Sequence, residues 1–115
     1  MGSSAETLNG AELDAWVARV EGLHEISFEG TGSARKCIAR MRGTLRAAAF
    51  QPSTDWAVAG PIMERERIGL RDVLAHGEPM FEAMLRHNDV TWFAQGELPL
   101  LAAMRVYVRS RFPEG

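Results

Sequence analysis

The sequence predicts an α+β fold, a helix-rich single domain with a small antiparallel sheet of short strands. Its length of 115 residues is typical of one domain, so we expect residues 1–115 to share one core. Apolar residues recur at helical spacing between positions 13 and 20, whereas residues 25–29 alternate between polar and apolar types. Residues 90–94 are rich in strand-forming side chains. Together these patterns require both helices and strands.

The composition favours a cytoplasmic protein. Hydrophobic residues make up 46% of the chain and charged residues 24%, which is ordinary for a soluble globular protein. Apolar runs stay well short of the roughly 20 residues that cross a bilayer, so we expect no membrane association. The first four residues lack the basic start and apolar centre of a signal peptide. We expect residues 1–7 to be disordered or derived from a cloning tag.

The first helix is predicted between Asn9 and Gly22. Asn9 is a suitable N-cap, and Glu12 lies three positions later, as in a capping box. Gly22 is typical of a helix end. Four apolar residues share one stripe of this helix: Leu13, Trp16, Val17 and Val20.

A short strand at residues 25–29 is predicted to end at the glycine-containing segment 30–32. This segment has neither the spacing of a P-loop nor all the glycines of a dinucleotide fingerprint, so nucleotide binding is not expected. A second helix is predicted over residues 33–49, with Ser33 as its cap. A break at Gly43 that leaves a strand near residues 37–41 is the alternative.

Residues 50–68 form the most distinctive segment. Pro52 ends the preceding element by about Phe50, and residues 53–55 suit a tight turn or an N-cap. We predict that the Gly-Pro step at residues 60–61 introduces a strand over residues 62–68. A helix is the alternative, because Glu and Arg are good helix formers.

The remaining elements are predicted from the spacing of apolar residues and from residues that typically begin or end a helix. Residues 70–76 predict a short helix that ends at Gly77, and Pro79 predicts the start of another helix that ends at Asn88. The strand at residues 90–94 is expected to pair with residues 62–68. A last helix is predicted from Pro99 to residue 112. Its predicted buried side chains are Leu101, Met104, Val108 and Phe112.

The segment Pro52-Ser53-Thr54-Asp55-Trp56 is followed by Gly60-Pro61-Ile62 and Glu64-Arg65-Glu66. Together these residues resemble the central motif of a phage and prophage family of unknown function that is typified by the NinX protein. Residues 8–22 resemble the N-terminal helix of the family, and residues 98–108 resemble its C-terminal helix. The resemblance implies a small cytoplasmic protein of phage or prophage origin. The resemblance implies no particular activity for this chain.

We predict a non-enzymatic binding module that contacts an unidentified protein partner through residues 52–67. Polar turn residues beside an aromatic side chain make good contact points. The predicted contact residues are Ser53, Thr54, Asp55, Trp56, Glu64, Arg65, Glu66 and Arg67. The alternative is that the turn residues only cap the backbone while Trp56 packs in the core. A homodimer is also predicted, since a short exposed strand can pair across a two-fold axis.

Nucleic-acid binding is the alternative function. The segment between Thr31 and Thr54 contains no acidic residue, and its basic side chains are Arg35, Lys36, Arg40, Arg42 and Arg46. Pairing of these cations with the acidic face of the first helix is the interpretation we prefer. The net charge of −2 also disfavours nucleic acid.

An enzyme acting on a small metabolite is the third option. The chain has three histidines, isolated in sequence, and a single cysteine, so no metal-binding spacing is present. Cys37 lies on an apolar stripe, which favours an inert core residue. Glu64 and Glu66 would share a strand face, but arginines alternate with them, as on a solvated edge strand. We therefore predict no catalytic residue, metal or cofactor.

Overall fold

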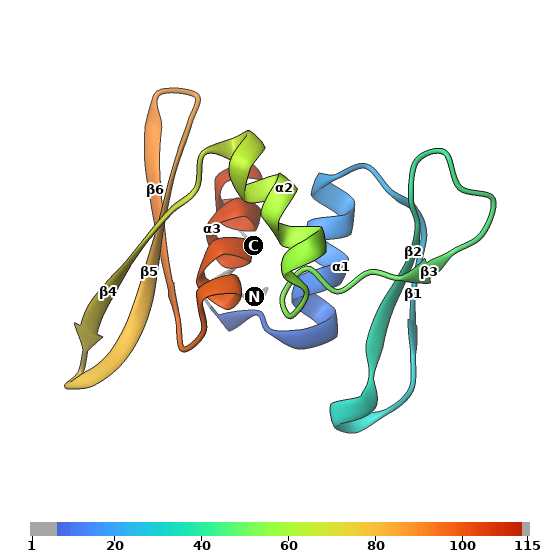
Figure 1. Cartoon of the computed structure of the whole chain (residues 1–115), viewed down its shortest axis with the longest axis horizontal. Coiled ribbons are helices and arrows are strands. Elements are labelled where there is room, and N and C mark those ends of the chain that lie inside the picture. The colour runs from blue at the N-terminus through green and yellow to red at the C-terminus, as the bar shows by residue number, and fades with distance from the viewer. Residues whose placement is uncertain (1–6, 114–115) are drawn as a thin grey trace.

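The computed structural model describes residues 7–113, and within them two small antiparallel sheets flank a group of helices (Figure 1). Residues 1–6 of the segment predicted to be disordered or tag-derived lie outside this range. The helices are α1 (Gly10–Val20), η2 (Gly32–Ala34), α2 (Trp56–Glu66) and α3 (Pro99–Arg111). The strands are β1 (His24–Glu29), β2 (Lys36–Arg40), β3 (Ala48–Ala49), β4 (Gly69–Ala75), β5 (Glu78–His87) and β6 (Val90–Gly96). The predicted α+β class is confirmed, although strands are as extensive as helices.

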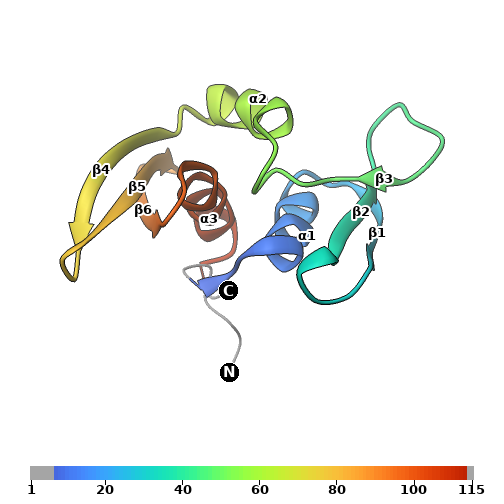
Figure 2. The same ribbon diagram turned by 60° about the horizontal axis from the view of Figure 1, so that its bottom comes forward.

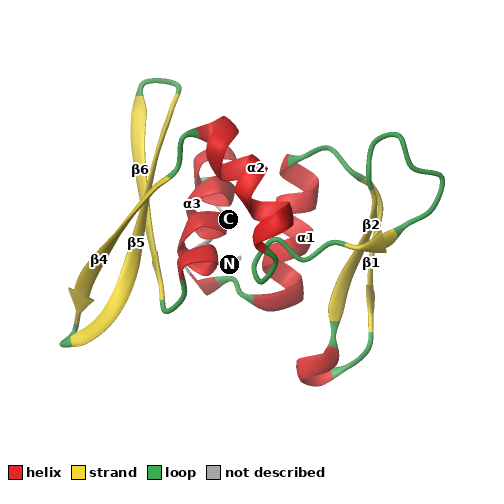
Figure 3. Ribbon diagram, viewed as in Figure 1, coloured by secondary structure: helices red, strands yellow, loops and turns green. Residues whose placement is uncertain are grey.

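The layers run from sheet β1–β2–β3 through α1 and α3 to sheet β4–β5–β6 (Figures 1 and 3). In the turned view of Figure 2, α2 lies above the α1–α3 pair, between the two sheets. The main core lies along α1 and α3, where Leu13, Val17, Met104 and Val108 are fully buried. No helix among residues 7–113 combines the length and apolar character that crossing a membrane requires.

The two terminal helices are confirmed, but the Asn9 side chain does not form the predicted cap, and Phe112, predicted to be buried, is 37% exposed. The α1 stripe packs as predicted at Leu13 and Val17, and Trp16 meets the ring of Phe112 edge-on with ring centroids 5.2 Å apart. Pro99 occupies the first turn of α3. Most of α3 is buried because α1, α2 and sheet β4–β5–β6 surround it.

The predicted helix over residues 33–49 is wrong, and the alternative strand near residues 37–41 is confirmed as β2. β2 is the central strand of its sheet and presents a run of buried residues, Cys37–Ala39, to its neighbours. Such a run matches both a buried helix and a buried strand, so local spacing does not separate them. Ser33 begins only the 3₁₀ turn η2, and Gly43 has φ +79°, which ends any helix there.

The predicted strand over residues 62–68 is also wrong, because these residues complete α2 and its C-terminus. Asp55 caps α2, since its Oδ1 accepts a hydrogen bond of 2.9 Å from the Ala57 amide. Pro61 lies inside the helix, where the preceding Gly60 has no Cβ to clash with the ring. Arg67 has φ 56° and the Ile68 amide donates to the Met63 carbonyl, which is a Schellman ending.

The two helices predicted over residues 70–88 are wrong as well. β4 pairs with β5 along the whole length of β4, and the turn between them has φ values of 53° at His76 and 80° at Gly77. Asn88 and Asp89 also have positive φ in the turn before β6. Two successive residues with positive φ form the hairpin turn that suits twisted strands. The predicted strand over residues 90–94 is confirmed in β6, but its partner is β5.

Candidate functional site

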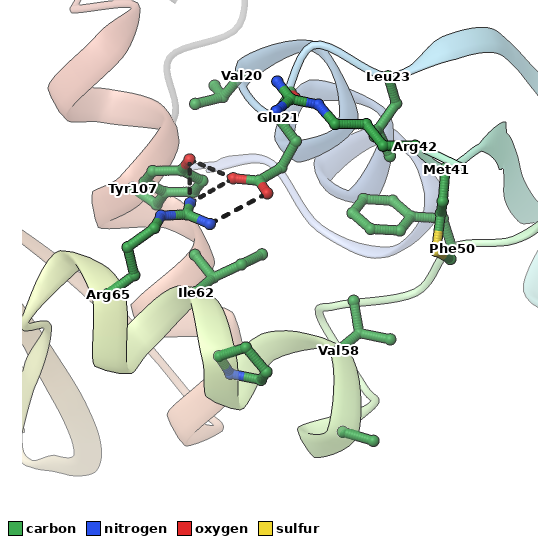
Figure 4. A pocket seen from close by; sticks show the side chains of 12 residues that line it. Val20, Glu21, Leu23, Met41, Arg42, Phe50, Val58, Ile62, Arg65 and Tyr107 are labelled. Carbon is green, nitrogen blue, oxygen red and sulfur yellow. Dashed lines mark hydrogen bonds and ion pairs between the residues drawn. The ribbon is translucent and has the colours of Figure 1, made fainter. Parts of the chain in front are cut away.

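A groove of about 670 Å³ opens beside α2 (Figure 4). Its walls come from α2, from the C-terminal end of α1, from the segments flanking β2 and β3, and from α3. The lining residues are Val20, Glu21, Leu23, Met41, Arg42, Phe50, Ala57, Val58, Pro61, Ile62, Arg65 and Tyr107. Most are apolar, and the polar ones gather at the end formed by α1 and α3.

The helical period of α2 explains why one stretch of sequence builds both the core and the groove. Ala59 and Ile62 are buried, and Ile62 also lines the groove. Ala57, Val58, Pro61 and Arg65 line the groove as well, on a neighbouring stripe. A third set, at positions 56, 64 and 67, is exposed. The apolar content of α2 therefore exceeds what its contact with the core uses.

The polar end of the groove is built around Glu21, Arg65 and Tyr107 (Figure 4). Arg65 Nη2 lies 2.6 Å from Glu21 Oε2 and 2.9 Å from the Tyr107 hydroxyl oxygen. The hydroxyl in turn donates to Glu21. Burial raises the pKa of Tyr107 and the bond to Glu21 raises it further, while the bonds to Glu21 and Glu66 raise the pKa of Arg65. At neutral pH the phenol is therefore protonated and the guanidinium charged.

Glu66 extends this network to the C-terminal end of α3. It accepts a hydrogen bond of 2.9 Å from Arg65 Nε and one of 2.6 Å from Arg111 Nη2. Burial acts to raise the pKa of Glu66, but the two guanidinium groups outweigh it and the pKa is lowered. Two carboxylates and two guanidiniums thus join α1, α2 and α3.

The turn before α2 is anchored to α1. The Ser53 amide donates a hydrogen bond of 2.8 Å to Oδ1 of Asp14, and both side chains are buried. Burial raises the pKa of Asp14 to about 6, although the hydrogen bond from the Ser53 amide acts to lower it. This bond fixes residues 52–55 against α1, and α2 begins from that fixed point.

The predicted contact residues divide into two sets. Ser53, Asp55, Arg65 and Glu66 make the internal bonds described above. The other set is exposed: Thr54, Trp56, Glu64 and Arg67. Trp56 has 56% of its surface exposed, so it does not pack in the core as the alternative interpretation required.

The residues of the nucleic-acid alternative do not form a continuous cationic surface of unpaired side chains. Arg35 lies 3.6 Å from Glu12 and stacks over the Phe28 ring at 3.9 Å, and Arg40 lies 2.6 Å from Glu25. The pairing of Arg35 with Glu12 matches the preferred interpretation, because Glu12 belongs to α1. The other three are Lys36, half-buried on β2, and Arg42 and Arg46, exposed in the loop after it.

The site predicted from the sequence does not include Asp14, Glu21 or Tyr107. For two of these residues, the sequence indicates that the side chain needs a cation or a hydrogen-bond partner nearby. Glu21 is the C-cap of α1, where the helix dipole disfavours a carboxylate, so a nearby cation is needed. Tyr107 is the one tyrosine of the chain and lies within an apolar helix, where its hydroxyl requires a hydrogen bond. Asp14 gives no such signal before its burial is known.

Comparison with known proteins identifies a phage family. The model of the family described as Bacteriophage P22, NinX matches residues 4–111. The match includes all three helices of the groove and both sheets. None of the curated proteins matches the chain. The resemblance of the N-terminal, central and C-terminal segments is thereby confirmed, and the chain belongs to the NinX family of bacteriophage P22.

Proposed function

We propose that this phage-family protein is a non-enzymatic binding module that contacts a protein partner through the exposed side of residues 52–67. The contact ridge, as we name it, consists of Thr54, Trp56, Glu64 and Arg67. The exposure of Trp56 carries the proposal, because 56% of this large apolar side chain faces solvent at the first residue of α2. Tryptophan and arginine are enriched among residues that dominate binding energy.

The geometry of α2 supports this role. Glu64 lies eight residues after Trp56, which turns it by about 80° around the axis of α2, and Arg67 is the exposed left-handed residue that follows the helix. The helix is fixed at its start by the Asp55 cap and the Asp14–Ser53 bond, and at its end by Arg65 and Glu66. A ridge held at both ends loses little conformational entropy when a partner binds.

A capture experiment tests the proposal. Tagged wild-type protein and Trp56→Ala are incubated with lysate of the phage host, and bound proteins are quantified by mass spectrometry. We expect Trp56→Ala to reduce capture of a specific partner by about tenfold or more, as for a central interface aromatic. Leu74→Ala is the matched control, because Leu74 is an exposed apolar residue on β4. Equal capture of the partner by Trp56→Ala and Leu74→Ala would refute binding through the contact ridge.

Folding must be unchanged for this comparison to be valid. More than half of Trp56 faces solvent, so we expect Trp56→Ala to keep the circular-dichroism spectrum of the wild type. The cytoplasmic location and the homodimer stay predictions, and fractionation of infected cells and sedimentation of the purified chain test them.

A further inference from the structure

We propose that the groove beside α2 binds a small organic anion, with its apolar body against Phe50, Val58 and Ile62 and its anionic group at Arg42. This site is distinct from the contact ridge, which lies on another stripe of α2. The proposal rests on the shape of the groove, on its apolar walls and on the arrangement of its charges.

The size and walls of the groove suit a small apolar body. Its volume of about 670 Å³ falls within the range of roughly 300–1,000 Å³ that is typical of small-molecule sites. Leu23, Met41 and Phe50 form one side, and Val58 and Ile62 face them from α2 (Figure 4). Methionine adapts its shape to irregular ligands, and the aromatic ring of Phe50 offers a face for stacking.

The charges at the polar end favour an anion. Glu21 is the acidic residue of the lining, and its carboxylate already accepts bonds from Arg65 and Tyr107. Arg65 is in turn engaged by Glu21, Glu66 and Tyr107. These three groups hold one another, so they are not available to neutralise a ligand of either sign without breaking bonds.

Arg42 is the second arginine of the groove lining, and it can bind an anionic ligand. Among residues 7–113 its guanidinium makes one hydrogen bond, at 3.4 Å, to the backbone carbonyl of Glu21. The guanidinium has several N–H donors in a planar fork that matches a carboxylate, sulfonate or phosphate. Figure 4 shows the Arg42 side chain extending along the groove toward Glu21. Most of its donors are therefore open to a ligand.

Two fluorescent probes with the same body test the inference. 1-Anilinonaphthalene-8-sulfonate carries a sulfonate and an N–H group, whereas N-phenyl-1-naphthylamine lacks the sulfonate. We expect the wild type to bind the sulfonate probe about tenfold more tightly in titrations at low salt, in line with a charge-assisted hydrogen bond. Arg42→Gln should abolish this preference and change the affinity for the neutral probe by less than about twofold.

Two further variants locate the probes. Ala57→Leu places extra methyl groups in the groove and should weaken both probes, while Arg46→Gln removes a cation of the same loop outside the groove and should change neither. A sulfonate affinity that survives Arg42→Gln, or probe binding that survives Ala57→Leu, would overturn the proposal. Absence of binding by the wild type would overturn it as well. Trp56→Ala should leave both titrations unchanged, so failure here is separable from failure of the contact ridge.

Discussion

Arg65 Nη2 lies 2.6 Å from Glu21 Oε2, although the two residues are 44 positions apart in the sequence. The same Glu21 oxygen accepts a bond from the hydroxyl of Tyr107. One carboxylate therefore joins the end of α1 to the last turn of α2 and to the middle of α3. All three residues line the groove at its polar end.

We expect Glu21→Gln to lower the free energy of unfolding by about 1–2 kcal/mol. The amide keeps the size of the side chain but loses the charge that binds Arg65 and Tyr107. The figure is modest because 51% of the Arg65 side chain is exposed and water screens the pair. Urea denaturation measures the change. Glu64→Gln is the control, since Glu64 is exposed on α2 next to Arg65. We expect this variant to change the free energy of unfolding by less than about 0.5 kcal/mol. Equal losses in the two variants would contradict this role of Glu21.

Asp14 should make stability depend on pH. Burial raises its pKa from 3.8 to about 6. Between these values the folded chain keeps a proton that the unfolded chain releases, so the free energy of unfolding falls as pH rises through this window. The total loss is about 2–3 kcal/mol, since a tenfold difference in proton affinity between the two states corresponds to about 1.4 kcal/mol.

Asp14→Asn tests this dependence. The asparagine oxygen still accepts from the Ser53 amide, but the side chain cannot ionise, so the decline between pH 3.8 and about 6 should largely disappear. Thermal unfolding at a series of pH values measures the slope. Asp72→Asn is the matched control, because Asp72 is exposed on β4, and it should keep the wild-type slope. A slope that Asp14→Asn leaves intact would assign the dependence to other groups.

The terminal helices could be predicted because their local pattern agrees with their tertiary surroundings. Residues 70–88 could not, because their apolar residues match helical spacing by coincidence. Leu70 and Val73 face opposite sides of sheet β4–β5–β6, as their pairing with Ala83 and Met80 shows. The two-residue turns at His76-Gly77 and Asn88-Asp89 are the better indication of strands. Their positive φ values permit a hairpin and exclude a continuous helix.

The composition of residues 52–67 identified this segment as a candidate site. Which of its side chains bond to other parts of the chain and which face solvent depends on the secondary structure. In a strand, Glu64 and Glu66 would share one face and Arg65 and Arg67 the other. In α2 each residue turns by about 100° from the last, so Arg65 and Glu66 reach Glu21 and Arg111 while Glu64 points to solvent. The partners of the inner pair come from α1 and α3, far away in the sequence, and no local pattern specifies them.

Gly96 allows α3 to approach the end of β6. A Cβ at this position would lie 2.8 Å from the amide nitrogen of Ala102 and 3.1 Å from the Cβ of Leu101. Gly96→Ala must shift the backbone of α3, and we expect it to lower the free energy of unfolding by about 1–3 kcal/mol. Gly69→Ala is the matched control, because a Cβ at the start of β4 meets nothing within 4 Å. Calorimetric unfolding compares the two, and an equal change would refute the close approach.

Cys37 should be unreactive in the folded protein. Its side chain is fully buried on β2. Burial and the negative charge of Asp14 together raise the pKa of the thiol to about 11, and Arg19 opposes this rise. At pH 8 about one thiol in a thousand is ionised, against roughly a quarter of free cysteine. Reaction with a disulfide reagent should therefore be at least about a hundredfold slower than for an exposed thiol. The reference is Ser33→Cys in a Cys37→Ser background, since Ser33 is exposed in η2. Reaction of native Cys37 at the rate of that reference would mean that β2 opens readily from α1, and addition of urea should produce that rate only as the chain unfolds.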